Sequence, residues 1–206
     1  MLSRVRAILR DSSTGYFADT ELYDFIDSGQ NKVIQLGLTK ELMGRKANYK
    51  SPVLTPLITL DTSNTTTVGA SYQEYTLPSD FLAINYAEYS TSNAGTKYAC
   101  SIVDFNEALI RGKNAYANSI TAPMIYVRAE KIGFMPQASG AGANNYIHYY
   151  YKQPAIVTSS QDFTLREEAH ESIEEWALYQ AYQEKQEYDK AQMHLNNFII
   201  GISDLC

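Results

Sequence analysis

The spacing of apolar residues changes twice along this chain, and that change constrains the fold more than any other feature. Apolar residues recur at helical spacing near both ends. The middle contains prolines, a Thr/Ser/Asn-rich run and stretches rich in β-forming residues. The pattern therefore predicts an α+β protein in which a bundle of long N- and C-terminal helices carries a central β-rich insertion.

The N-terminal part predicts two helices. Residues 2–10 have the spacing of a short amphipathic helix. A longer helix is expected over residues 18–44, with Asp19 or Thr20 as its N-cap and Gly44 at its end.

The middle of the chain reads as short strands separated by turns. The alternating stretch at 72–90 and the segment at 97–104 are predicted strands, and residues 104–112 form one or two helical turns. The remaining expectations are a hairpin over 124–136 that turns near Ala129 and Glu130, a small-residue loop at 138–145, and a tyrosine-rich strand that Pro154 terminates.

The C-terminal part contains no proline, and no glycine until Gly201, so it predicts one long helix that Thr164 caps. Gly201 is expected to break this helix and to leave an apolar tail. The chain is then a single domain over 1–206, in which helical segments 1–50 and 162–201 pack together around the β-rich insertion 51–161.

The stretch "YIHYYYKQPA" at 146–155 allows three interpretations. It could stack nucleic-acid bases, coordinate a ligand through His148, or form one aromatic strand of a packed sheet. A stacking platform needs basic neighbours, and Lys152 is the only one here. Tyrosines on both faces of a strand instead favour an aromatic strand that is packed on both sides.

Charge is unevenly distributed. The net charge is −6, and residues 161–206 carry 3 Lys/Arg against 10 Asp/Glu, whereas residues 1–50 carry 8 against 6. An acidic chain does not gather around phosphates, which argues against a free-standing nucleic-acid binder. Two cysteines without CxxC spacing do not form a disulfide framework, and the default is a reducing compartment. No signal peptide and no stretch of about 20 apolar residues is recognised, so a soluble chain is expected.

A search for chemical motifs finds one candidate. Glu167, His170 and Glu174 share one helical face, and Glu-x-x-His is the spacing that a helix supplies to a di-iron bundle. A second such motif is missing, so a solvated acidic turn is favoured. His148 and His194 are isolated from other ligand types, which favours structural roles. We expect no catalytic residues, no cofactor and no metal.

The order of several soft patterns resembles a known family. The segments are "VRAILRDSSTGYFADTELYDFIDSGQNKVIQ", "YTLPSDFLAI", "KIGFMPQASGAGANNYIHYYYKQPA" and "REEAHESIEEWALYQAYQEKQEYDKAQMHLNNF". Together they resemble the tailed-phage head-to-tail connector proteins, also called portal adaptors, which are related to the tubular tail protein A family of short-tailed phages. The resemblance covers nearly the whole chain and is weakest over about 90–125.

The resemblance implies a virion structural protein. It implies a ring of copies, expected to be a dodecamer, at the head–tail junction, assembled in the host bacterial cytoplasm. The implied partners are the portal protein, the tail tube or nozzle protein, other copies of the chain, and genomic DNA that passes without specific binding. It implies no membrane contact and no catalysis.

Two other functions remain open at this point. One is a different neck or tail-completion ring protein. The other is a small metal- or carboxylate-dependent hydrolase built around Glu167, His170 and Glu174. For the adaptor reading, the apolar C-terminal tail and the tyrosine strand provide the candidate portal or subunit interface, which comprises Phe198, Ile200, Ile202, Leu205, Tyr146 and Tyr150.

Overall fold

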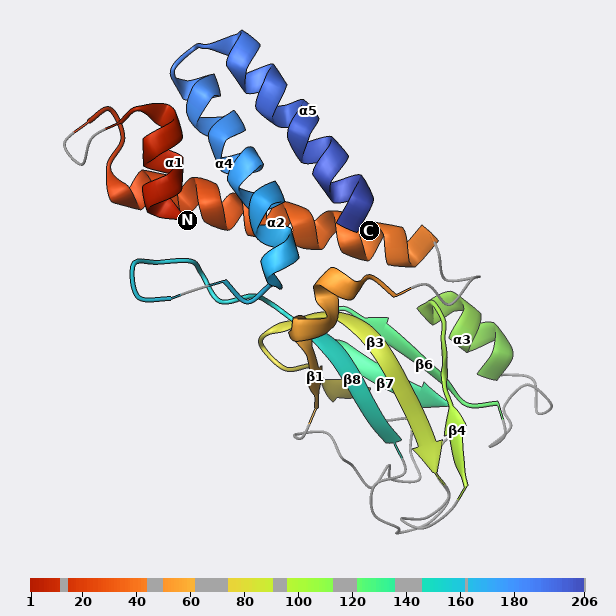
Figure 1. The fold of residues 1–206 in the computed structure, drawn as a ribbon. Helices are drawn as coiled ribbons and strands as arrows, with labels where there is room; N and C mark the ends of the chain where they lie inside the picture. The colour runs from red at the N-terminus through yellow and green to blue at the C-terminus, as the bar shows by residue number, and fades with distance from the viewer. Residues whose placement is uncertain are drawn as a thin grey trace. The chain divides into compact units, whose positions relative to one another are not determined.

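The chain forms two compact units in the computed structural model (Figure 1). A helical unit comprises residues 1–57 and 154–206, and a β unit comprises residues 58–153. The fold is mixed α+β, as the sequence predicts. The structure describes residues 1–11, 15–43, 50–61, 74–90, 96–112, 122–135, 146–161 and 163–205.

The helical unit is built from segments at both ends of the chain. α2 and α4 approach closely at Gly29, where an added Cβ would lie 2.9 Å from the Ile173 carbonyl oxygen. Glycine is required there because any side chain would separate the two helices. The elements are α1 (Leu2–Leu9), α2 (Asp19–Met43), the 3₁₀ helices η2 (Pro52–Leu57) and η3 (Glu167–Ala169), α4 (His170–Glu184) and α5 (Tyr188–Leu205).

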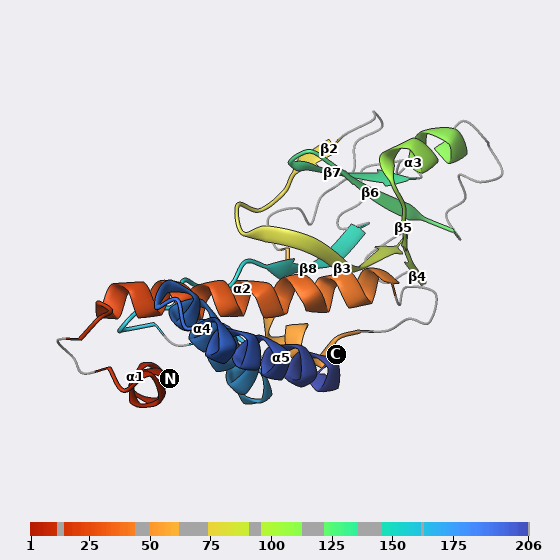
Figure 2. The same ribbon diagram turned by 90° about the horizontal axis from the view of Figure 1, so that it is seen from above.

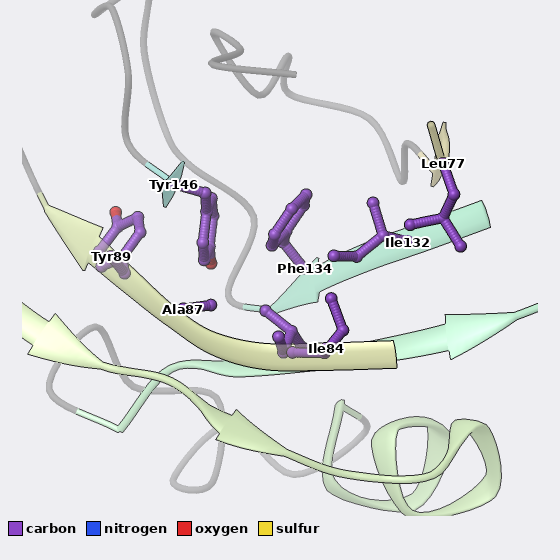
Figure 3. Close-up of a cluster of buried hydrophobic side chains, with 8 residues drawn as sticks. Leu77, Ile84, Ala87, Tyr89, Ile132, Phe134 and Tyr146 are labelled. Carbon is purple, nitrogen blue, oxygen red and sulfur yellow. The ribbon is translucent and has the colours of Figure 1, made fainter. Parts of the chain in front are cut away.

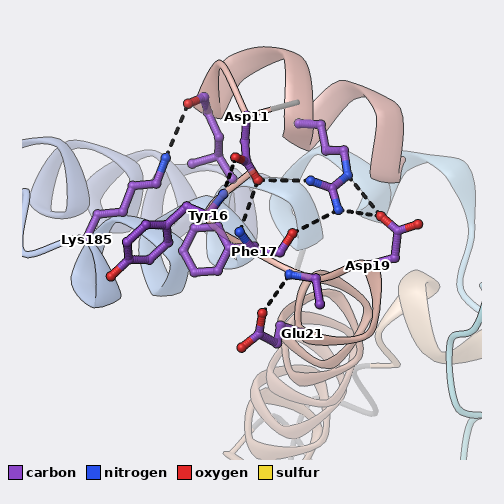
Figure 4. Close-up of polar contacts among 9 residues, drawn as sticks. Asp11, Tyr16, Phe17, Asp19, Glu21 and Lys185 are labelled. Carbon is purple, nitrogen blue, oxygen red and sulfur yellow. Dashed lines mark hydrogen bonds and ion pairs between the residues drawn. The ribbon is translucent and has the colours of Figure 1, made fainter. Parts of the chain in front are cut away.

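A polar network fixes the junction between α1 and α2 (Figure 4). Arg6 donates to Asp11 at 2.9 Å, to the Phe17 carbonyl at 3.1 Å and to Asp19. The Asp11 carboxylate in turn accepts the Tyr16 backbone N–H at 2.7 Å. The two helices predicted at 2–10 and 18–44 are thus present and held together.

The start of α2 differs in detail from the prediction. The Glu21 carboxylate accepts the Ala18 backbone N–H at 2.7 Å, which is the reciprocal half of a capping box. Asp19 pairs with Arg6 instead of capping the helix. The predicted end at Gly44 lies outside the described residues.

The single C-terminal helix is a wrong prediction, because the chain reverses between α4 and α5 (Figure 1). Gln186 adopts φ 59°, the left-handed conformation. Its N–H donates to the Gln183 carbonyl, and the Glu187 N–H donates to the Tyr182 carbonyl, which is a Schellman motif. The predicted cap is also misplaced, since α4 begins at His170 and the Thr164 hydroxyl accepts the Ala155 N–H at 3.3 Å.

The described residues of the β unit form two four-stranded sheets and one short helix. One sheet has the order β1-β8-β3-β4 and is antiparallel. The other has the order β2-β7-β6-β5, in which only β5 and β6 run parallel. The elements are β1 (Ile58–Leu60), β2 (Glu74–Thr76), β3 (Phe81–Ser90), β4 (Lys97–Ala99), β5 (Ser101–Ile102), α3 (Phe105–Gly112), β6 (Met124–Arg128), β7 (Lys131–Met135) and β8 (Tyr146–Lys152).

Local signals in the middle of the chain predicted these elements well. β6 and β7 form the expected hairpin, and Ala129 has φ 51° at its turn. The Asp104 carboxylate accepts the Glu107 N–H at 2.8 Å and caps α3. The tyrosine-rich strand is β8, which ends at Lys152. The loop predicted at 138–145 lies outside the described residues.

Candidate assembly surface

α5 presents two different faces, because its apolar residues are not confined to one side. Ala191, Phe198 and Ile202 are buried, and Phe198 contacts Trp176 of α4 with the ring centroids 4.9 Å apart. Ile200 lies on the opposite face, Ile199 lies at the flank between the two faces, and both are more than half exposed. A surface helix ordinarily keeps such residues on the buried side. The outer face of α5 therefore carries exposed apolar residues among polar ones, and no described part of the helical unit covers them.

Only one of the four candidate interface residues on α5 is largely exposed. Ile200 is 61% exposed, whereas Phe198 and Ile202 are 2% and 6% exposed. Leu205 is partly buried. Phe198 and Ile202 therefore belong to the core of the helical unit, and Ile200 is the candidate that a partner can reach.

Gly201 does not break the helix, which corrects the prediction of a hinged tail. α5 continues through Gly201 to Leu205. A Cβ added at Gly201 would lie 2.7 Å from the Ser172 hydroxyl oxygen of α4. The glycine thus lets the last turns of α5 approach α4.

A pocket of about 410 Å³ lies beside this close approach. Its carboxylate side chains come from η3 and α4, and its apolar side chains come from the end of α5. Glu175 is held in place by His194 at 2.7 Å and by Asn197 at 3.2 Å. The lining residues are Glu168, Glu171, Ser172, Glu175, Asn197, Ile200, Gly201 and Leu205.

Carboxylates crowd the first turns of α4. Burial raises the pKa of Glu174, and the nearby Glu175 and Glu171 carboxylates raise it further. The Arg4 guanidinium, 2.9 Å from Glu174, acts in the opposite direction. This end of the helical unit is therefore acidic, and Arg4 is already paired with the buried Glu174 carboxylate.

Glu167 and His170, the residues of the rival metal hypothesis, lie in this same region and line a second pocket with Glu174. His170 Nε2 is 3.4 Å from the Leu165 carbonyl oxygen. Within the described ranges, no group of three His, Cys, Asp or Glu side chains is arranged to hold a metal ion.

Tyr146, the first residue of the tyrosine strand, lies in a buried cluster of the β unit (Figure 3). Tyr146 is fully buried and stacks on Phe134 of β7, with the ring centroids 4.3 Å apart. Tyr150 is 6% exposed and donates to Asp80 at 2.8 Å, and burial raises its pKa to about 12. Tyr150 also stacks on the Phe81 ring of β3, with the ring centroids 5.7 Å apart, so neither tyrosine offers a surface.

Comparison with known protein families identifies the chain. Its sequence matches the family described as SU10 adaptor protein over residues 1–205. The chain belongs to this family. Membership supports the predicted resemblance and is consistent with a phage head–tail adaptor, a component of the virion. A search of curated proteins found no match.

The adaptor family match spans the sequence of both units, including the region near 90–125 where the resemblance is weakest. Among the described helices of the adaptor, none is long and apolar enough to cross a membrane.

Sequence reasoning missed one polar pair in the adaptor. His148 Nε2 lies 3.0 Å from Asp61 Oδ2, and both side chains are 1% exposed. The pairing of Leu60 with Tyr149 brings Asp61 beside His148. Burial lowers the pKa of His148, against the opposing effect of Asp61. The two residues are distant in sequence, so no local spacing could have revealed the pair.

Proposed function

We propose that the chain is a ring-forming head-to-tail adaptor that docks the tail on the portal and forms part of the DNA channel. The match to the SU10 adaptor protein family over residues 1–205 carries this proposal. The proposed partners are the portal protein, the tail tube or nozzle protein, and further copies of the chain in a dodecameric ring.

The exposed apolar residues of the helical unit support an assembly role. Contiguous apolar surface on a soluble protein commonly marks an interaction site. On α5, Met193 and Ile200 lie two turns apart on the outer face, Ile199 flanks them, and all three are more than half exposed. This outer face of α5 is the surface that we propose to contact the portal or a neighbouring subunit.

Negative-stain images of the purified chain mixed with its portal test this function directly. Rings that gain a further layer of density in the presence of the chain are the expected result. Portal rings that remain undecorated at saturating chain concentration would count against the proposal. A point substitution on α5 is a better additional test than a truncation, because deleting residues 199–206 would also remove the buried Ile202.

We also propose that the chain has no catalytic role and passes DNA without gripping it. The net charge of −6 supports weak DNA binding, since like charges repel phosphates. Submicromolar affinity for duplex DNA at physiological salt would contradict this. Stoichiometric zinc or iron that is lost on His170→Ala would instead favour the hydrolase alternative.

A further inference from the structure

Two polar side chains of the acidic pocket have no partner among the residues that the structure describes. Glu171 is exposed, and no ion pair of its carboxylate is found among the described residues. Ser172 is 3% exposed and lines the pocket, and its hydroxyl has no hydrogen bond within the same described part of the chain. The hydroxyl oxygen can accept a hydrogen bond from a donor that enters the pocket.

The other carboxylates of the pocket are already engaged. Glu175 accepts from His194 and Asn197, and Glu168 lies 3.6 Å from Arg166. Arg4, on the adjacent surface, is bound to Glu174. Glu171 is therefore the carboxylate open to an added cation, and the exposed Ile200 supplies an apolar rim beside it.

The opposite end of α4 carries a cation and an exposed apolar residue. Arg10 ends α1 in the left-handed conformation and is exposed, and within the described ranges it forms no ion pair. Ile8 is 38% exposed. Both are held near the end of α4, because Tyr182 donates to the Ile8 carbonyl at 3.3 Å and Lys185 donates to the Leu9 carbonyl at 3.4 Å.

The two surfaces cannot meet within one chain. Ser172 and Tyr182 are separated by roughly 15 Å along α4 at 1.5 Å per residue. In both ribbon views, α1 lies towards one end of the helical unit and the C-terminal end of α5 towards the other (Figures 1 and 2). One end of the helical unit thus presents a cation beside an apolar residue, and the other end presents a carboxylate pocket with an apolar rim. These two surfaces are complementary when they belong to different copies of the chain.

We propose that Arg10 of one copy enters the acidic pocket of a second copy of this chain. Its guanidinium donates to the Glu171 carboxylate and to the Ser172 hydroxyl, and Ile8 packs against Ile200. Two different surfaces of the same chain then meet, which is a heterologous contact that either closes into a ring or continues as a filament. The inference deepens the proposed function, because it assigns the contact through which copies of the adaptor associate.

Self-association of the full-length chain tests this contact. Sedimentation velocity at low ionic strength would compare wild type with Arg10→Glu and Glu171→Lys, over a range reaching the highest soluble concentration. Each substitution is expected to weaken association at least about tenfold, which corresponds to about 1.4 kcal/mol. An equimolar mixture of the two variants should recover association. At one contact the introduced glutamate of Arg10→Glu faces the introduced lysine of Glu171→Lys, and at the next contact the native arginine and glutamate face each other.

Asp24→Lys is the matched control. Asp24 is an exposed carboxylate of α2 in a pocket that already holds its own cation, Lys32, so association should be unchanged. Far-UV circular dichroism and the melting temperature would verify that each variant is folded.

Three results would overturn the proposal: wild type that stays monomeric throughout, single variants that associate as wild type does, or a mixture that fails to recover. Portal decoration is scored separately. Undecorated portals together with charge-dependent self-association would refute the portal role alone.

Discussion

The two units of the chain place their large apolar side chains differently. In the β unit, Tyr146, Tyr126 and Phe134 are buried, and most of the exposed large apolar side chains are only 36–38% exposed, with Ile110 the exception at 73%. In the helical unit, most such side chains are more than half exposed, including Met43 at 80% and Ile200 at 61%.

The two units therefore use their apolar side chains for different purposes. The β unit buries its rings between two sheets and is largely complete by itself, as an aromatic cluster with ring centroids 4–6 Å apart indicates. The helical unit buries enough to fold, yet exposed apolar side chains of α5 and the Glu171 carboxylate have no partner among the described residues. We infer that the helical unit provides the main assembly surface and that the β unit is chiefly scaffold.

The largest expected effect separates buried from exposed residues of α5. Phe198→Ala should lower the free energy of unfolding by about 4 kcal/mol, since it removes a buried ring that packs on Trp176. Ile199→Ala, one residue away and 54% exposed, should change it by less than about 0.5 kcal/mol. Urea denaturation followed by far-UV circular dichroism measures both. Equal losses would show that the two faces of α5 are assigned wrongly.

The next effect is confined to the β unit. A Cβ at Gly133 would lie 2.1 Å from the ring of Tyr126, which is 1% exposed and has no room to move. Gly133→Ala should cost about 3 kcal/mol through overpacking. Near-UV circular dichroism of the tyrosines, most of which lie in the β unit, should lose intensity, while fluorescence of the single tryptophan, Trp176, reports the helical unit.

Gly37→Ala is the matched change in the helical unit. Its Cβ would lie 3.2 Å from the nearest Leu54 side-chain atom, a contact that a small shift relieves, and alanine favours the helix by roughly 1 kcal/mol. A small or favourable change is expected. If Gly37→Ala is as damaging as Gly133→Ala, the helical unit is more tightly packed than its exposed surface suggests.

A smaller effect depends on pH. Burial lowers the pKa of His148 in the folded state below its ordinary value of 6.5. The unfolded chain then binds the proton more readily, so the β unit should lose stability as pH falls below 6.5 towards the folded pKa. Each unit of depression corresponds to about 1.4 kcal/mol.

His148→Gln keeps a donor near the position of Nε2 without a titrating group. Its β unit should therefore show a flatter dependence of melting temperature on pH between neutral and mildly acidic conditions. If His148→Gln keeps the wild-type loss of melting temperature at acidic pH, that loss is caused by other titrating groups.

The smallest change in stability should accompany a clear loss of assembly. Ile200→Ser alters a side chain that is 61% exposed, so its free energy of unfolding should stay within about 0.5 kcal/mol of wild type. Its self-association and portal decoration should nevertheless weaken. Normal assembly by this variant would show that the outer face of α5 is not part of the assembly surface.

Elements with a strong local period could be predicted from the sequence. The helices at 2–10 and 18–44, the hairpin at 124–136 and the tyrosine strand all have the expected type. The reversal between α4 and α5 was missed because its left-handed residue is Gln186, where glycine is the usual signal.

Misassigned residues share a different cause, which is packing between distant segments. Gly201 reads as a helix stop, but its role is to make room for Ser172 of another helix. Tyr146 and Tyr150 read as interface residues, but Phe134 of the second sheet covers Tyr146 and Phe81 of β3 covers Tyr150. Burial decides which apolar residue can meet a partner, and periodicity alone could not rank Ile200 above Phe198.

A reconstruction of the chain assembled on its portal tests the central claim most directly. The account predicts that α1 of each copy lies against α4 and α5 of the next copy, with Arg10 beside Glu171 and Ile200 excluded from solvent. An assembly in which the outer face of α5 remains in solvent in every copy, while the β units alone connect neighbouring copies, would contradict it.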